Sequence, residues 1–237
     1  MKTVRQSHPV ALLIIALTGA LTACQGGDQK TTGQATTAAP PPRTSAPAPA
    51  SAVDDQTAVR RLVLTKADLP AGWKIDASED TSLPSGDITG TSHKDAAEAT
   101  GKSFEKGSLA VGSSAEIVKP DDDLTMDAAM LGSSGFARTL KSEFGKAMAE
   151  GNTGATTSSA SVKPLQIAKY GQYSIGYRVT SKITSEGIGI KVYMDWVWLA
   201  NERSSVEVSF GSAGAPFDPA LQKKLIAQLG SRLMAAR

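Results

Sequence analysis

The strongest constraint on the fold is an alternation of apolar and polar residues that repeats over three neighbouring runs, 173–183, 188–198 and 206–210. Apolar side chains at every second position are typical of β-strands that bury one face. Short connections, 185–187 and 201–203, leave room for tight turns between the runs. The sequence therefore predicts three adjacent antiparallel strands.

Two amphipathic helices are expected to cover this sheet. In the segment 135–151, large apolar side chains recur at every fourth position: Phe136, Leu140, Phe144 and Met148. A second apolar stripe follows Asp218, whose carboxylate suits a helix N-cap, and this stripe contains Leu221, Leu225, Leu229 and Leu233. We therefore expect an α+β fold in which helices pack on one face of an antiparallel β-sheet.

The first half of the domain is expected to hold less regular elements. A helix capped by Asp54 or Asp55 would open it, followed by strands that begin at Trp73 and span 109–118. Two polar segments are predicted to be loops because they contain few large apolar residues: 78–101 and 152–161.

Residues 1–23 have the pattern of an export signal. Lys2 and Arg5 precede an apolar run from Val10 to Ala20, which falls well short of the roughly 20 residues that a membrane-spanning helix needs. The next four residues, Leu-Thr-Ala-Cys, resemble the lipobox of bacterial lipoproteins. In a lipobox the cysteine thiol receives a diacylglyceryl group and becomes the new amino terminus after cleavage.

Cys24 is therefore expected to be lipidated, with palmitate-like chains, and to hold the protein on the extracytoplasmic face of the cell membrane. It is the only cysteine of the chain, so no disulfide partner explains its presence. The alternative is an ordinary secretory signal that ends beside a stray cysteine.

The mature chain divides into a tether and one domain. Residues 24–53 are rich in Thr, Ala and Pro and have almost no large apolar side chain, so they are predicted to be disordered. Glycosylation of this tether is left open. Residues 54–237 are long enough for a single globular domain with its own core.

Charge and histidine content argue against several classes of function. Without Lys2 and Arg5 of the signal, 23 basic residues face 23 acidic ones, and no basic stripe favours nucleic acid as a partner. His93 is the only histidine of the mature chain, which argues against a Ser-His-Asp triad or a histidine metal site. We expect neither an enzyme nor a bound metal or cofactor.

An acidic run, 121–123, together with Asp127, offers oxygen ligands for calcium. The run lacks the glycine and the terminal glutamate of an EF-hand loop. A solvated turn before a helix is the favoured interpretation.

One string carries a resemblance to known proteins. It reads Leu64-Thr65-Lys66-Ala67-Asp68-Leu69-Pro70-Ala71-Gly72-Trp73. With the three strands and the terminal helix, it resembles actinobacterial secreted lipoproteins, and is similar to the extracellular sensor-like domains of mycobacterial serine/threonine kinases and to small lipoproteins of the Mog1/PsbP-like fold. The resemblance implies a non-catalytic cell-surface domain that binds an unidentified ligand or protein.

The run 188–198 supplies a candidate ligand site. Its polar positions place Lys191, Tyr193 and Asp195 on the face opposite Trp196 and Trp198, with Arg178 of the preceding run as a further possible contact. The alternative is a solvent-facing surface on which Arg178 pairs with a carboxylate across the strands. The two tryptophans point the same way and are expected to lie in the core rather than in a sugar-binding platform.

Three hypotheses of function remain at this point. The first is a membrane-anchored binding or sensor domain. The second is a cell-envelope enzyme that uses carboxylates alone, with two acidic side chains about 5 to 9.5 Å apart in a cleft. The third is a scaffold lipoprotein without a small-molecule ligand.

Overall fold

The computed structural model describes residues 52–76, 93, 96–150, 156–157, 160–185 and 188–236. The export signal, Cys24 and all but the last two residues of the predicted tether lie outside this part of the chain. Within the described residues, no helix is both long and apolar enough to cross a bilayer.

The described residues form a mixed sheet-and-helix domain whose centre is a nine-stranded sheet. Its strands are β1 (Lys74–Ile75), β2 (Ala97–Thr100), β3 (Phe104–Lys106), β4 (Leu109–Ile117), β5 (Thr156–Thr157), β6 (Ser161–Pro164), β7 (Tyr173–Ser185), β8 (Ile188–Asn201) and β9 (Ser204–Ala213). The order is β1-β3-β4-β9-β8-β7-β5, with β2 on β4 and β6 on β7. Antiparallel pairing of β7 with β8 and of β8 with β9 confirms the predicted three strands.

The helices are α1 (Ala52–Val59), the 3-10 turn η1 (Lys66–Asp68), α2 (Thr125–Leu131), α3 (Ser134–Glu150) and α4 (Pro219–Ala235). The amphipathic helices α3 and α4 confirm the two predicted stripes. The Asp218 carboxylate accepts a hydrogen bond of 2.9 Å from the backbone N–H of Ala220, which confirms its role as N-cap. The helix α1 begins at Ala52, so Asp54 and Asp55 are inside it rather than at its cap.

Two segments expected to be loops contain strands. In the first, β2 pairs along β4 through the register Ala97↔Ile117, and in the second, β5 and the start of β6 pair with β7. These strands have few large apolar side chains of their own. They form because long neighbouring strands offer unpaired backbone groups, a tertiary effect that local composition does not report.

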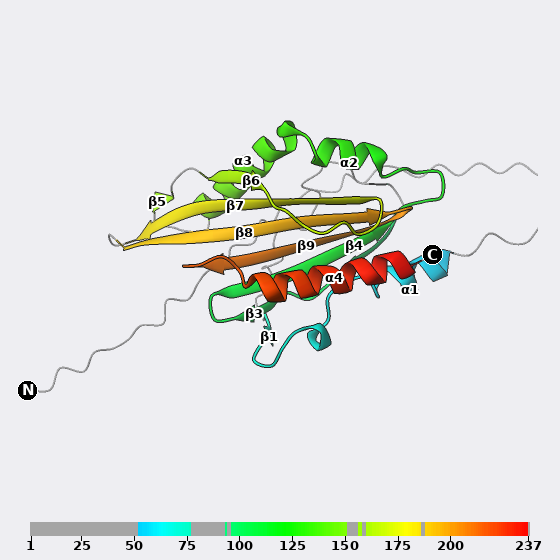
Figure 1. Ribbon diagram of the computed structural model, residues 1–237, viewed down its shortest axis with the longest axis horizontal. Coiled ribbons are helices and arrows are strands. Elements are labelled where there is room, and N and C mark those ends of the chain that lie inside the picture. Colours follow the sequence, from blue (N-terminus) through cyan, green and yellow to red (C-terminus); the bar gives the residue numbers. More distant parts are fainter. Residues whose placement is uncertain are drawn as a thin grey trace, which may run out of the picture.

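Helices lie on both faces of the sheet, where the sequence had indicated one face. In Figure 1, α4 lies along β4 and β9, whereas α2 and α3 lie beside β6 and β7. We name the two faces after their helices: Val197 and Leu199 of β8 point to the α4 face, and Trp196 and Trp198 point to the α2–α3 face. A strand that is apolar at successive positions is typical of burial on both sides.

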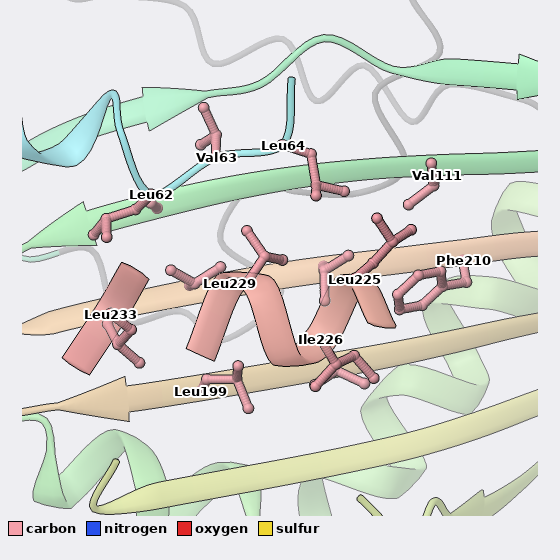
Figure 2. Close-up of a cluster of buried hydrophobic side chains, with 14 of the residues drawn as sticks. Leu62, Val63, Leu64, Val111, Leu199, Phe210, Leu225, Ile226, Leu229 and Leu233 are labelled. Carbon is pink, nitrogen blue, oxygen red and sulfur yellow. The ribbon is translucent and has the colours of Figure 1, made fainter. Parts of the chain in front are cut away.

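The α4 face carries the larger hydrophobic cluster. Figure 2 shows Leu225 and Leu229 of α4 directed at the sheet, with Val111 of β4 and Phe210 of β9 beside them. The segment 62–64, which follows α1, inserts its side chains along the same cluster. This packing joins the beginning of the domain to its last helix.

Asp68, in the string of residues 64–73, has a structural role. Its carboxylate accepts hydrogen bonds from the backbone and hydroxyl of Thr65 and from the guanidinium of Arg232 on α4. Burial alone would raise the pKa of Asp68, but these hydrogen bonds outweigh it and lower the pKa below its ordinary value. Trp73, at the end of the string, is buried with its ring 5.9 Å from that of Phe217. The string therefore fixes α4 on the sheet.

Candidate functional site

Arg178 and Asp195, two of the four predicted contact residues, meet as a cross-strand pair between β7 and β8. The guanidinium Nε and Nη2 of Arg178 donate to the two oxygens of Asp195, both at 2.6 Å. The amide of Gln222 on α4 donates to Oδ2 of the same carboxylate at 2.8 Å. Hydrogen bonding to Asp195 raises the pKa of Arg178, so the guanidinium stays charged.

This network lies beneath a helix. Asp195 is 1% exposed, because α4 covers its face of β8. The cross-strand pairing with Arg178, which the sequence offered as the alternative to ligand binding, is present. The surface that carries it is covered by α4 rather than solvent-facing. Tyr193 is half-buried and Lys191 is exposed, further along the same strand. Ligand contact by any of the four residues stays a prediction.

The tryptophans of β8 lie in the core of the α2–α3 face. Trp196 is completely buried, with its ring centroid 5.0 Å from that of Phe136 on α3. Trp198 is nearly as buried, and its ring stacks at 6.3 Å on that of Tyr173. The core role predicted for the pair is confirmed.

The same face carries a group that the sequence analysis missed, Glu207 on β9. It lies opposite Trp198 of β8 and opposite Ser114 of β4. Burial raises the pKa of Glu207 to about 8, and the indole N–H of Trp196 lowers it by a smaller amount. At neutral pH the carboxyl group is therefore mostly protonated.

Two atoms of this pair lack a well-formed hydrogen bond. Oε1 of Glu207 and Nε1 of Trp196 are both shielded from solvent, and neither makes a hydrogen bond of ordinary geometry within the described residues, although the indole N–H lies near enough to the carboxyl group to lower its pKa. A buried polar atom in this state costs about 1–3 kcal/mol. The side chain of Glu207 nevertheless keeps some accessible surface, so it lies deep in the fold without being sealed.

Small and acidic residues surround Glu207 on the α2–α3 face. Ser205 and Ser209 flank it on β9 and are buried, while Ser114 and Glu116 on β4 are half-buried. Farther out, on β2, the side chains are exposed: Glu98 and Thr100 lie opposite Glu116 and Ser114. The side chains next to Glu207 are thus small, and those on β2 are exposed.

His93 adds a second polar group at this end of the sheet. Its Nε2 lies 2.8 Å from Oδ2 of Asp127 on α2, and its Nδ1 lies 3.8 Å from Asp122. Burial would lower the pKa of His93, but the hydrogen bond to Asp127 and the charge of Glu116 outweigh it and raise the pKa. The histidine is therefore held next to Glu116 by a buried carboxylate.

The acidic run before α2 forms the expected turn. The carboxylate of Asp123 accepts hydrogen bonds from the backbone N–H and the hydroxyl of Thr125, at 2.8 and 2.7 Å, where α2 begins. These bonds lower the pKa of Asp123. Among the described side chains, no group of three or more His, Cys, Asp or Glu residues is arranged to hold a metal ion.

Glu207 gave little signal in the sequence. It lies between Val206 and Val208, at a polar position in a strand whose apolar and polar residues alternate, and such a position is typical of a solvent-facing residue. Its depth results from its place between β4 and β8 in the assembled sheet, and β4 is distant in the sequence. The small residues at alternate positions, Ser205 and Ser209, were the one local indication of space on that face.

Comparison with known proteins gives a distant structural likeness. No family model matches the chain, and no curated protein matches it. Among solved structures, the chain is similar to LpqN of Mycobacterium tuberculosis, described as involved in cell envelope biogenesis, with a TM-score of 0.28 and 9% sequence identity. The match covers 71% of this chain and 78% of LpqN. At this level of similarity no residue correspondence follows.

The Arg178–Asp195 pair is expected to behave as a coupled structural unit. Asp195→Leu should lower the free energy of unfolding by about 3 kcal/mol, because it leaves a partly buried guanidinium unpaired. The double variant Arg178→Met/Asp195→Leu should lose less than the sum of the two single variants. Denaturant unfolding of the four proteins measures this coupling, and additive losses would contradict it.

Glu207 is expected to make stability depend on pH. Between the ordinary pKa of 4.5 and the folded value of about 8, the folded chain keeps a proton that the unfolded chain has released. Stability from this group is therefore present below about pH 4.5 and is lost as the pH rises to about 8. Glu207→Gln cannot ionise, so it should melt higher than the wild type at pH 8 and equally near pH 4.

Thermal unfolding at several pH values tests this expectation. Glu105→Gln on β3 is the matched control, since Glu105 is exposed and lies opposite Ala110, well along β4 from Ser114. The control should show no pH-dependent difference from the wild type. A difference between Glu207→Gln and the wild type that stays constant from pH 4 to pH 8 would show that Glu207 is not buried in the protonated state.

Proposed function

We propose that this protein is a lipid-anchored lipoprotein of the cell envelope whose folded domain binds a ligand or a partner without chemical turnover. The lipidated residue is Cys24, and the tether 24–53 holds the domain away from the membrane. The binding surface is the α2–α3 face around Trp196 and Glu207. The Arg178–Asp195 network serves the same domain by fixing α4 on the opposite face.

The anchor is supported by the sequence. A basic start, a short apolar run and Leu-Thr-Ala-Cys follow one another in the order of a lipoprotein signal. The tether is too polar to pack, and its prolines favour extended conformations. This arrangement suits a domain that acts at a distance from the bilayer surface.

One observation supports the binding role: the fully buried indole N–H of Trp196 and Oε1 of the deep Glu207 carboxyl group lie on one face, and neither atom makes a hydrogen bond of ordinary geometry within the described residues. Domains rarely retain two such groups together, because each destabilises the fold. A ligand that completes their hydrogen bonds gives a physical reason for keeping them.

The anchor predicts a clear effect of removing the thiol. In a bacterial host that modifies lipoproteins, the wild-type chain should incorporate labelled palmitate and partition into the detergent phase. Cys24→Ser should do neither and should keep the uncleaved signal, because the thiol is the acceptor of the diacylglyceryl group. Mass spectrometry of the amino-terminal peptide measures both, and Ser45→Ala in the tether is a control that should behave as the wild type.

A second candidate function is hydrolysis by two carboxyl groups. Glu116 and Glu207 are diagonal neighbours on β4 and β9, because Glu116 lies opposite Ser205 and Ser114 lies opposite Glu207. Diagonal neighbours on one face are about 7–8 Å apart. One acid with a raised pKa beside a second carboxylate is the arrangement that glycoside hydrolysis requires.

The two candidates differ in one measurable result. Purified full-length protein is incubated with isolated cell-wall polysaccharide, and released reducing ends are counted. The binding role predicts release no greater than that of Glu207→Gln. A release at least tenfold above that of the variant would replace the binding role with a glycosidase.

A further inference from the structure

The α2–α3 face near Glu207 has an excess of acidic side chains. Glu116 and Glu98 continue the row across β4 and β2, and Asp122 and Asp127 lie around His93 at the same end. His93 lies among these carboxyl groups, and the residues that α3 directs at the sheet are apolar. An electrostatic field of this sign attracts a cation.

Oε1 of Glu207 and Nε1 of Trp196 add a requirement for hydrogen bonding, which the negative charge of the face does not by itself impose. Trp196 is 0% exposed, and its indole N–H is directed close enough to Glu207 to favour the ionised carboxylate. While Glu207 is protonated, its carbonyl oxygen is a weaker acceptor for the indole N–H than a carboxylate oxygen would be. An ionised Glu207 could accept from the indole and from a second donor together, which would satisfy both groups at once.

We propose that the α2–α3 face binds its ligand through a guanidinium or ammonium group, which is held by Glu207 and Glu116 over the indole edge of Trp196. This inference rests on the proposed binding function and specifies the class of ligand. The cation supplies the missing donor. It also supplies the positive charge that allows Glu207 to lose its proton inside the fold.

Binding is therefore coupled to the release of a proton from Glu207. Below its pKa of about 8, the ionised fraction of Glu207 rises about tenfold with each unit of pH, so the affinity should rise by the same factor and level off above that value. The facing groups are Glu98, Glu116, Asp122, Asp127 and His93. The pKa of His93 is raised, and the loss of its charge as the pH rises also favours a cation.

The experiment uses the purified full-length chain in detergent with two small probes. Methylguanidinium stays charged throughout the range, and N-methylurea has a similar shape without the charge. Titration calorimetry at pH 6, 7, 8 and 9 should show affinity for methylguanidinium that rises about tenfold from pH 6 to 7, with N-methylurea at least tenfold weaker at pH 8. Calorimetry in two buffers of different ionisation enthalpy should detect about one proton released near pH 7.

Two variants separate this site from a general effect of charge. Glu207→Gln should bind methylguanidinium at least tenfold more weakly at pH 8 and should release no proton. Glu105→Gln removes one negative charge elsewhere on the surface and should keep both the affinity and the pH dependence. The indole N–H resonance of Trp196 should move on binding in the wild type and in the Glu105 variant.

The outcomes distinguish this inference from the function on which it rests. Binding of N-methylurea equal to or tighter than that of methylguanidinium would overturn the cation while leaving a binding domain. Absence of binding by both probes, or unchanged binding in Glu207→Gln, would overturn the site. Failure of Cys24 to be lipidated would overturn the anchor and would leave the cation result unaffected.

Discussion

Burial of β8 on both faces is the constraint on which the rest of the structure depends. Val197 and Leu199 lie under α4, and Trp196 and Trp198 lie under α2 and α3. Each fully buried side chain of this size contributes about 1.5–3 kcal/mol, so the strand stabilises both helix layers at once. Because β8 has no exposed face along this stretch, a polar residue on it or beside it must find its partners inside the protein.

The polar groups at this strand differ in how far they find such partners. On the α4 face, Asp195 is fully engaged by Arg178 and Gln222, so its charge is neutralised where it is buried. On the α2–α3 face, Trp196 and Glu207 are left incomplete among the described residues. The first arrangement fixes a helix on the sheet, and the second leaves two buried polar atoms without a well-formed hydrogen bond.

The sequence predicts a helix or strand correctly where a local pattern of apolar side chains is enough to determine it. The alternation of β7, β8 and β9 and the stripes of α3 and α4 are local, and Asp218 marks the start of α4 correctly. The placement of helices on both faces was missed. In the run Trp196-Val197-Trp198-Leu199 both alternating sets of residues are apolar, which indicates burial on both faces, whereas the expectation rested on one set alone. The strand β2 was missed because its pairing with β4, rather than its composition, forms it.

The candidate site was harder to predict because depth is a property of the assembled fold. Asp195 and Glu207 are both acidic residues at polar positions of alternating strands, so the sequence gives no reason to expect different environments for them. Packing separates them, since Arg178 stabilises the charge of one while burial raises the pKa of the other to about 8. Glutamine at position 207 would keep the shape at a lower cost in stability. A chain that carries glutamate there retains a group that destabilises it at neutral pH, and such groups are typical of positions where charge is needed for function.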